Sequence, residues 1–184
     1  TMLGIIIGIA SVVSIVALGN GSQQKILSDI NSMGTNTIDI YPGEGFGDMR
    51  SGRVKTLTDT DSQILNKQSY VDSSTSNSST SGTLTYKNIA VTAQVKGVGF
   101  EYFDGKGIDI ATGNKFYKQD VLNSAQVAVI DKNTKDKLFP NGEDPIGKVI
   151  FINKKPLQVI GVSADKKSAF GNDDSLNIWS PYTT

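Results

Sequence analysis

The sequence predicts an α+β fold in which a long N-terminal helix, first membrane-spanning and then a stalk, precedes a mixed domain. Three observations predict it. Residues 2–18 form an apolar run without a charge. Residues 88–96 alternate apolar and polar side chains, as a half-buried strand does. Residues 149–152 and 157–162 are two β-forming runs separated by a short polar turn, which is typical of a hairpin.

The apolar run is at the short end of what a bilayer core needs, roughly 20 residues for about 30 Å. Gly19 to Gly21 supply the missing turn, and helical spacing then continues without a break to Gly34, a natural helix stop. At about 1.5 Å per residue, a helix over residues 2–33 is about 48 Å long. We therefore expect it to cross a membrane and project from one side.

The alternative for this segment is a cleaved signal peptide on a secreted binding domain. Ala17-Leu18-Gly19 fits a small-x-small cleavage pattern, but no basic region precedes the run. The amphipathic continuation favours a membrane span, because cleavage would leave that helix without a purpose. N-terminal sequencing that finds Asn20 as the first residue would establish the alternative.

Two sets of residues on this helix are candidate functional positions. Small residues let membrane helices approach closely, and this predicts a transmembrane packing face made by Gly4, Gly8, Ser11 and Ser14. Apolar residues at helical spacing, Ile26, Ile30 and Met33, predict an amphipathic extension of the helix. Gly19 and Gly21 each cost about 1 kcal/mol in a helix, so their junction is either a hinge or a weak spot. These five residues are the candidate coupling positions of the stalk.

In the first half of the remaining chain, residues 37–41 alternate as a strand that Pro42-Gly43 ends. Thr58 is the predicted N-cap of a helix, because Asp59 and Asp61 follow it in the first turn. This helix is predicted to run to about Gln68. The Ser/Thr-rich residues 70–85 fit either a disordered linker or an extended strand.

In the second half, residues 100–103 are expected to form a short aromatic helical turn. Residues 126–130 predict a buried strand, after which Asp131 caps a helix that ends near Phe139. The hairpin follows, and residues 177–179 form a last short strand. This half is predicted to be rich in β-structure.

Composition excludes several functions. The chain has no cysteine and no histidine, which rules out Ser–His–Asp and Cys–His catalysis and thiolate zinc sites. Lys plus Arg equals Asp plus Glu at 18 each, so no net field favours nucleic acid. The carboxylate pairs Asp59/Asp61 and Asp173/Asp174 lack calcium-loop spacing. No set of residues supports catalysis.

One stretch imitates a phosphate-binding loop. Residues 142–148 fit G-x-x-x-x-G-K, but Val149 stands where a magnesium-binding hydroxyl is required. Two carboxylates face the phosphate position, and Pro145 lacks a backbone donor. A turn that leads into a hairpin strand is the simpler interpretation.

Two stretches resemble MacB-type ABC transporter permeases. Residues 1–25 look like the family's first transmembrane helix, and the likeness continues through residues 30–43. Residues 144–153 with 157–162 resemble the hairpin of its periplasmic core. The resemblance implies a transmembrane helix over 1–19, a periplasmic stalk over 20–34, and a two-lobed periplasmic domain.

In that domain, the resemblance implies the first part of an α/β porter-like lobe over 35–103 and a β-rich sabre-like lobe over 104–184. It also implies that this sequence is a fragment, whose closing strands would follow residue 184 in the parent protein. It also implies a non-catalytic part of a homodimeric inner-membrane efflux permease. The partners would be a MacA-like periplasmic adaptor and a TolC-like outer-membrane channel, and the exported substrates macrolides, peptides or toxins. No cofactor is expected here, since ATP and magnesium would bind a separate domain. A lipoprotein-releasing or cell-division permease is the alternative.

Overall fold

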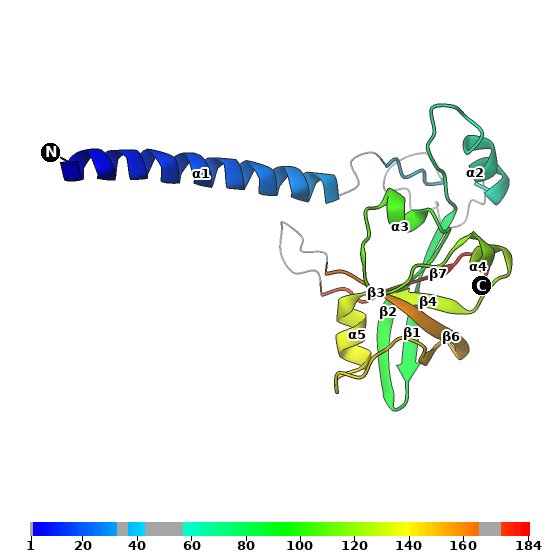
Figure 1. Cartoon of the computed structure of the whole chain (residues 1–184). Coiled ribbons are helices and arrows are strands. Elements are labelled where there is room, and N and C mark those ends of the chain that lie inside the picture. Colours follow the sequence, from blue (N-terminus) through cyan, green and yellow to red (C-terminus); the bar gives the residue numbers. More distant parts are fainter. Residues whose placement is uncertain (1, 33–36, 43–56, 166–173) are drawn as a thin grey trace.

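The computed structural model describes residues 2–32, 37–42, 57–165 and 174–184. In these ranges a long helix, α1, extends from a domain in which short helices surround one seven-stranded sheet (Figure 1). The helices are α1 Met2–Ser32, α2 Asp59–Leu65, α3 Tyr102–Gly105, α4 Lys118–Leu122 and α5 Lys132–Leu138. The strands are β1 Asn77–Tyr86, β2 Ile89–Val98, β3 Ile110–Gly113, β4 Val127–Ile130, β5 Val149–Ile152, β6 Lys155–Ser163 and β7 Asn177–Pro181. The predicted α+β class is confirmed.

Six of the strands close into a ring. The sheet order is β3-β6-β4-β7-β2-β1-β5, and β5 also pairs with β6. β2 and β7 are parallel, as are β4 and β6, and the other neighbours are antiparallel. Each strand of the ring therefore has a partner on both sides for at least part of its length, and β3 extends the sheet beside one end of β6.

Two apolar clusters hold this sheet in place. The first lies inside the ring and takes residues from all six strands and from α5: Leu84, Ala93, Ala128, Ile130, Leu138, Phe139, Ile150, Ile152, Leu157, Val159, Val162 and Ile178. The second lies on the outer face of β2, β4 and β7, under α3 and α4: Val98, Phe103, Phe116, Val121, Val129 and Trp179. Because side chains alternate along a strand, Val129 and Ile130 reach different clusters.

Short-range hydrogen bonds and backbone conformation define the N-termini of α2 and α5 and the turn between β5 and β6. The Thr58 hydroxyl and N–H both donate to Asp61, which starts α2. Asp131 accepts from the Thr134 N–H at 2.7 Å and caps α5. Asn153 and Lys154 take positive φ angles of 48° and 74°, so the β5–β6 hairpin turns in two residues rather than the expected four.

The strand predicted over residues 37–41 is wrong. These residues pair with no strand in the part of the chain that the structure describes, and Ile38 is 89% exposed. Alternation predicts an extended backbone, but a strand also needs a partner for its N–H and C=O groups. The segment instead contacts the end of α3, where Lys106 Nζ lies 2.7 Å from the Asp39 carboxylate.

The rest of the domain follows the predicted order with two additions. Most of the Ser/Thr-rich stretch over residues 70–85 forms β1. Of the two alternatives, a disordered linker or an extended strand, the strand is therefore correct. β3 and α4 were not predicted from sequence. Sheet pairing also crosses the expected lobe boundary at residues 103 and 104, because β2 pairs with β7 and β1 pairs with β5.

Candidate coupling and docking surfaces

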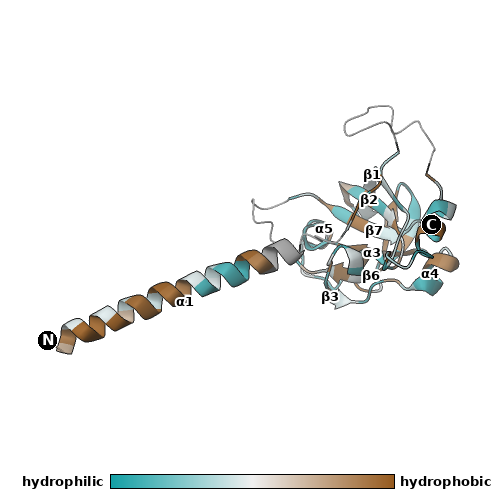
Figure 2. Ribbon diagram, turned by 90° about the horizontal axis from the view of Figure 1, so that it is seen from above, coloured by the Kyte–Doolittle hydropathy of each residue, from teal (hydrophilic) through white to brown (hydrophobic). Residues whose placement is uncertain are grey.

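Helix α1 exposes apolar side chains all round. Its candidate membrane-spanning segment is Met2–Leu27, within which the most apolar stretch of 18 residues has a mean hydropathy of 2.5 and is not buried within the chain. Figure 2 shows this apolar character over most of the helix and polar residues toward its end. At about 1.5 Å per residue, the segment is about 39 Å long and exceeds a bilayer core of about 30 Å. One helix is thus long and apolar enough to span a membrane.

The four residues of the predicted packing face spread over about 120° of the α1 surface. At about 100° per residue, Gly4, Gly8 and Ser11 fall within about 60° of one another, and Ser14 lies about 60° further round. A Cβ added at Gly4 or Gly8 would meet no atom within 4 Å. The Ser11 and Ser14 hydroxyls donate to the Ile7 and Ala10 carbonyls at 2.8 Å, so their protons are used within the helix.

The stalk positions from Gly19 to Ile30 lie on one uninterrupted helix. α1 continues through Gly19 and Gly21 as a single element (Figure 1), as the sequence predicts for a span with a helical extension. Ile26 is 58% exposed, and Ile30 lies in the next turn of the helix. Met33 lies outside the described residues. The roles of all these positions in packing and coupling stay predictions.

Polar contacts, rather than a core, attach α2 to the start of β1. No residue of α2 is buried. The Ser76 hydroxyl donates to the Asp59 carboxylate at 2.8 Å and lowers the pKa of that group. The Ser62 and Ser74 hydroxyls lie 3.0 Å apart, and the Asn66 amide donates to the Ser74 carbonyl at 2.7 Å. These contacts make α2 a weakly attached element of the surface.

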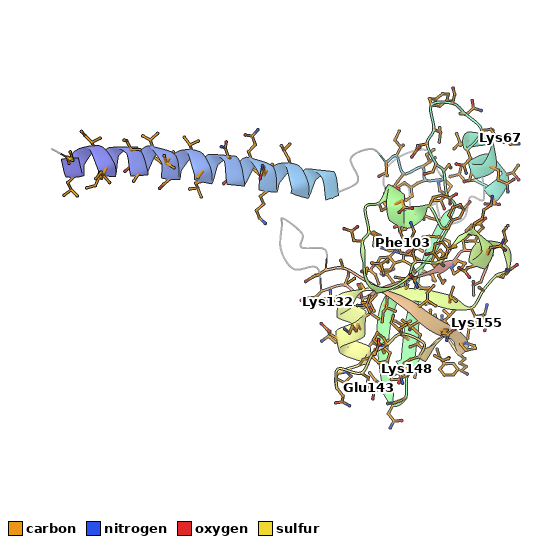
Figure 3. The ribbon with its side chains drawn as sticks, in the orientation of Figure 1. Lys67, Phe103, Lys132, Glu143, Lys148 and Lys155 are labelled. Carbon is orange, nitrogen blue, oxygen red and sulfur yellow. The ribbon has the colours of Figure 1, made fainter. Side chains whose placement is uncertain are left out.

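The turn between β1 and β2 forms a second polar cluster. Lys87 Nζ lies 2.7 Å from a Glu143 carboxylate oxygen, and the Tyr86 hydroxyl donates to the same carboxylate. These two hydrogen bonds, with that of Lys87 the stronger influence, hold the pKa of Glu143 below its ordinary value. Figure 3 labels Glu143 and Lys148 at this end of the domain, and the positive charge of Lys148 contributes to the lowering of the same pKa. The depression beside the cluster, about 50 Å³, is too small for a substrate.

No catalytic arrangement is present in the described ranges. They contain no group of three or more His, Cys, Asp or Glu side chains placed to hold a metal ion. The phosphate-loop imitation is a turn, as predicted: the Lys148 N–H donates to the Pro145 carbonyl at 3.1 Å, and Gly147 takes a φ of 79°.

Sequence reasoning missed two contacting residues. Lys106 joins the extended segment to α3, and the Asn153 amide oxygen accepts from the Thr83 N–H at 3.2 Å. These pairs are 67 and 70 residues apart in sequence. A single lysine or turn asparagine carries no sequence signal for a contact at that separation.

In the described ranges, a helix long and apolar enough to cross a membrane precedes a mixed helix-and-sheet domain, which is the arrangement of a membrane protein with a domain on one side. The family described as "MacB-like periplasmic core domain" matches residues 1–184, so the chain belongs to that family. The family is that of a periplasmic permease core and not of an ATP-binding region. This confirms the resemblance and indicates a membrane protein with a periplasmic domain.

Named relatives agree. The macrolide export ATP-binding/permease protein MacB of Neisseria gonorrhoeae is 62% identical over all 184 residues, which is 28% of its own length. A Yersinia pestis protein named MacB 2 is 58% identical over the same span, 27% of its length. The chain thus spans less than a third of the curated relatives it matches.

Solved structures show the same fold. The periplasmic region of MacB from Actinobacillus actinomycetemcomitans has a TM-score of 0.73 at 42% identity, covering 86% of this chain and 71% of that one. The extracellular domain of the ABC-type transporter YknZ from Gram-positive bacteria has a TM-score of 0.63 at 22% identity, covering 78% and 71%. The second likeness concerns the fold alone.

Proposed function

We propose that this chain is the coupling and docking part of an efflux ABC transporter permease in a bacterial inner membrane. It holds the periplasmic domain to the membrane and transmits the work of ATP hydrolysis mechanically. ATP and magnesium bind a separate domain of the parent protein, and this chain binds no cofactor. Macrolide is the leading substrate class, because the relatives carry that name; peptides and toxins are the further candidates.

The observation that carries the proposal is the continuity of α1. Helical hydrogen bonds run from Met2 to Ser32, through the apolar segment and into its polar extension. A helix is stiff along its axis, so displacement at one end reaches the other end. A flexible linker of the same length would absorb it. The exposed extension therefore supports a role as a lever.

The partners we propose are a second copy of the chain, a MacA-like adaptor and a TolC-like channel. A weakly attached α2 and an exposed 37–42 segment offer surface to a neighbour, and the small-residue face of α1 offers close approach to another helix. Adaptor capture should then depend on the periplasmic domain and survive a loss of ATP hydrolysis.

The test replaces residues 26–33 of the full transporter with a Gly/Ser sequence of equal length. ATP hydrolysis by reconstituted transporter should stay within about twofold, while export falls to background because the lever is lost. The matched control replaces the same residues with alanine, which keeps the helix. Unchanged export with the flexible sequence would end the mechanical proposal.

A further inference from the structure

The segment of residues 37–42, which follows α1 in the chain, contacts the domain at the end of α3. Lys106, the C-cap residue of α3, places its ammonium 2.8 Å and 2.7 Å from the two carboxylate oxygens of Asp39. The same ammonium lies 3.5 Å from the Thr37 hydroxyl oxygen. A Cβ added at Gly105 would meet the Thr37 Cγ2 at 3.9 Å, which is an ordinary van der Waals distance. Charge, hydrogen bonding and packing therefore hold two residues of the segment against the end of one helix.

The backbone around Lys106 fixes the position from which its side chain extends. The Lys106 N–H donates to the Tyr102 carbonyl at 3.0 Å, and the Ile108 N–H donates to the Phe103 carbonyl at 2.8 Å. Gly107 takes a φ of 56°, the left-handed conformation that commonly ends a helix. The ammonium therefore belongs to a hydrogen-bonded helix end.

Helix α3 joins this contact to the centre of the sheet. Phe103 is buried, and its ring packs edge-on against Phe116 and Trp179, with centroids 5.1 Å and 6.0 Å apart. Figure 3 shows Phe103 on the side of α3 that faces the sheet. Trp179 lies on β7, which pairs with β2 on one side and with β4 on the other. Because a close-packed interior transmits strain, a displacement of α3 reaches these strands.

The same contact is close to α1 along the chain. Only residues 33–38 separate Asp39 from Ser32, where α1 ends. At no more than about 3.6 Å per residue, the covalent chain allows at most about 25 Å between these two residues. Thr37, the first described residue after α1, already takes part in the contact. The end of α3 is therefore where the chain that leaves α1 meets the folded domain.

We propose that Lys106 is the positioning residue through which a displacement of α1 enters the domain. It holds the segment 37–42 on α3, and Phe103 carries the displacement to β7. This inference rests on the proposed mechanical coupling and names its point of entry. The two side chains of the ion pair are 25% and 40% exposed, and such a pair biases a position by up to about fivefold. Loss of Lys106 should therefore weaken coupling, whereas loss of the lever abolishes it.

The first test measures ATP hydrolysis and the export of a labelled macrolide by the full reconstituted transporter. Lys106→Met removes the ammonium and should lower export about threefold to fivefold, while ATP hydrolysis stays within about twofold. Lys106→Arg returns a cation and should keep export near its original level. Lys115→Met is the matched control, because it removes the other ion pair of α3, between Lys115 and Asp104 at 2.6 Å, and it should leave export unchanged.

A covalent bond in place of the ion pair tests the position directly. Thr37→Cys combined with Gly105→Cys brings two thiols within reach of a disulfide, in a sequence that has no cysteine of its own. Oxidation should restore export in the Lys106→Met background, and reductant should remove the gain; Thr37→Cys alone is the control. If the disulfide does not form with Lys106 present, the contact itself is overturned. If it forms and export is not restored, the role of Lys106 is overturned.

The Gly/Ser replacement of residues 26–33 separates this inference from the proposed function. If that replacement abolishes export and Lys106→Met leaves it unchanged, the lever stands and entry at Lys106 is overturned. If the Gly/Ser replacement leaves export unchanged, the lever and this inference fail together. Export that falls to background with the replacement and about threefold to fivefold with Lys106→Met is the expected result.

Discussion

Helix α1 and the ring of strands use the same residue types in opposite ways. Ile9 in α1 is 61% exposed, whereas Ile150 in β5 is fully buried. The sheet domain finds the environment for its apolar side chains within the chain, because six strands close around them. α1 touches none of that core, so its environment must come from outside the chain, from lipid or from other helices.

The comparison also separates two kinds of stability. Burial of apolar surface from water stabilises the domain and makes its packing sensitive to every methyl group. Insertion of α1 depends on the summed hydropathy of the helix and tolerates changes of shape. The same substitution should therefore give different results in the two regions.

The largest effect is expected in the core. Ile150→Ala should lower the free energy of unfolding of the domain by about 2–5 kcal/mol, because it leaves a cavity inside the ring. Ile9→Ala, the matched control, should change it by less than about 0.5 kcal/mol. Urea unfolding of the full chain in detergent, followed by fluorescence of the buried and single Trp179, measures both. Equal losses would show that α1 packs on the domain.

The second effect reverses the comparison. Ile9→Lys places a charge near the middle of the apolar segment and should disfavour membrane insertion by about 3 kcal/mol. Thr92→Lys adds the same charge to an exposed strand position and should leave insertion unchanged. Alkaline extraction of membranes measures the inserted fraction. Full retention of the Ile9→Lys chain would contradict α1 as a membrane span.

A third test compares glycines. Gly21→Ala meets no atom within 4 Å and should stabilise α1 by about 1 kcal/mol, seen as slower amide exchange around residue 21. Gly161→Ala should destabilise the domain by about 1–3 kcal/mol, because its Cβ would collide with the Asn114 carbonyl where β3 ends. Slower exchange combined with impaired export would identify Gly21 as a functional hinge.

The smallest effect is electrostatic and is confined to the domain. Lys87 and Tyr86 lower the pKa of Glu143, so the carboxylate stabilises the fold above its unfolded pKa, and that contribution disappears as pH falls through the folded value. Glu143→Gln should lower the urea midpoint slightly at pH 7 and match the unsubstituted chain at about pH 3. A constant difference at both pH values would assign the effect to packing.

The sequence predicted correctly those helices and strands that depend on interactions between residues near one another in the chain. Thr58 and Asp131 begin helices because their side chains accept or donate within the first turn. The β5–β6 hairpin follows from two strand-forming runs joined by turn residues. β1 remained ambiguous because a Ser/Thr-rich stretch has no apolar alternation, and pairing with β2 decides its conformation. β3 and α4 are too short to give a periodic signal.

The sequence by itself determined that α1 is a continuous apolar helix and that the domain is α+β without thiol or histidine chemistry. Both depend only on which residues occur and at what spacing. The tertiary structure alone decided that six strands close into a ring and that residues 37–41 pair with no strand in the described ranges. Strand pairing is a relation between distant segments, so no local pattern contains it.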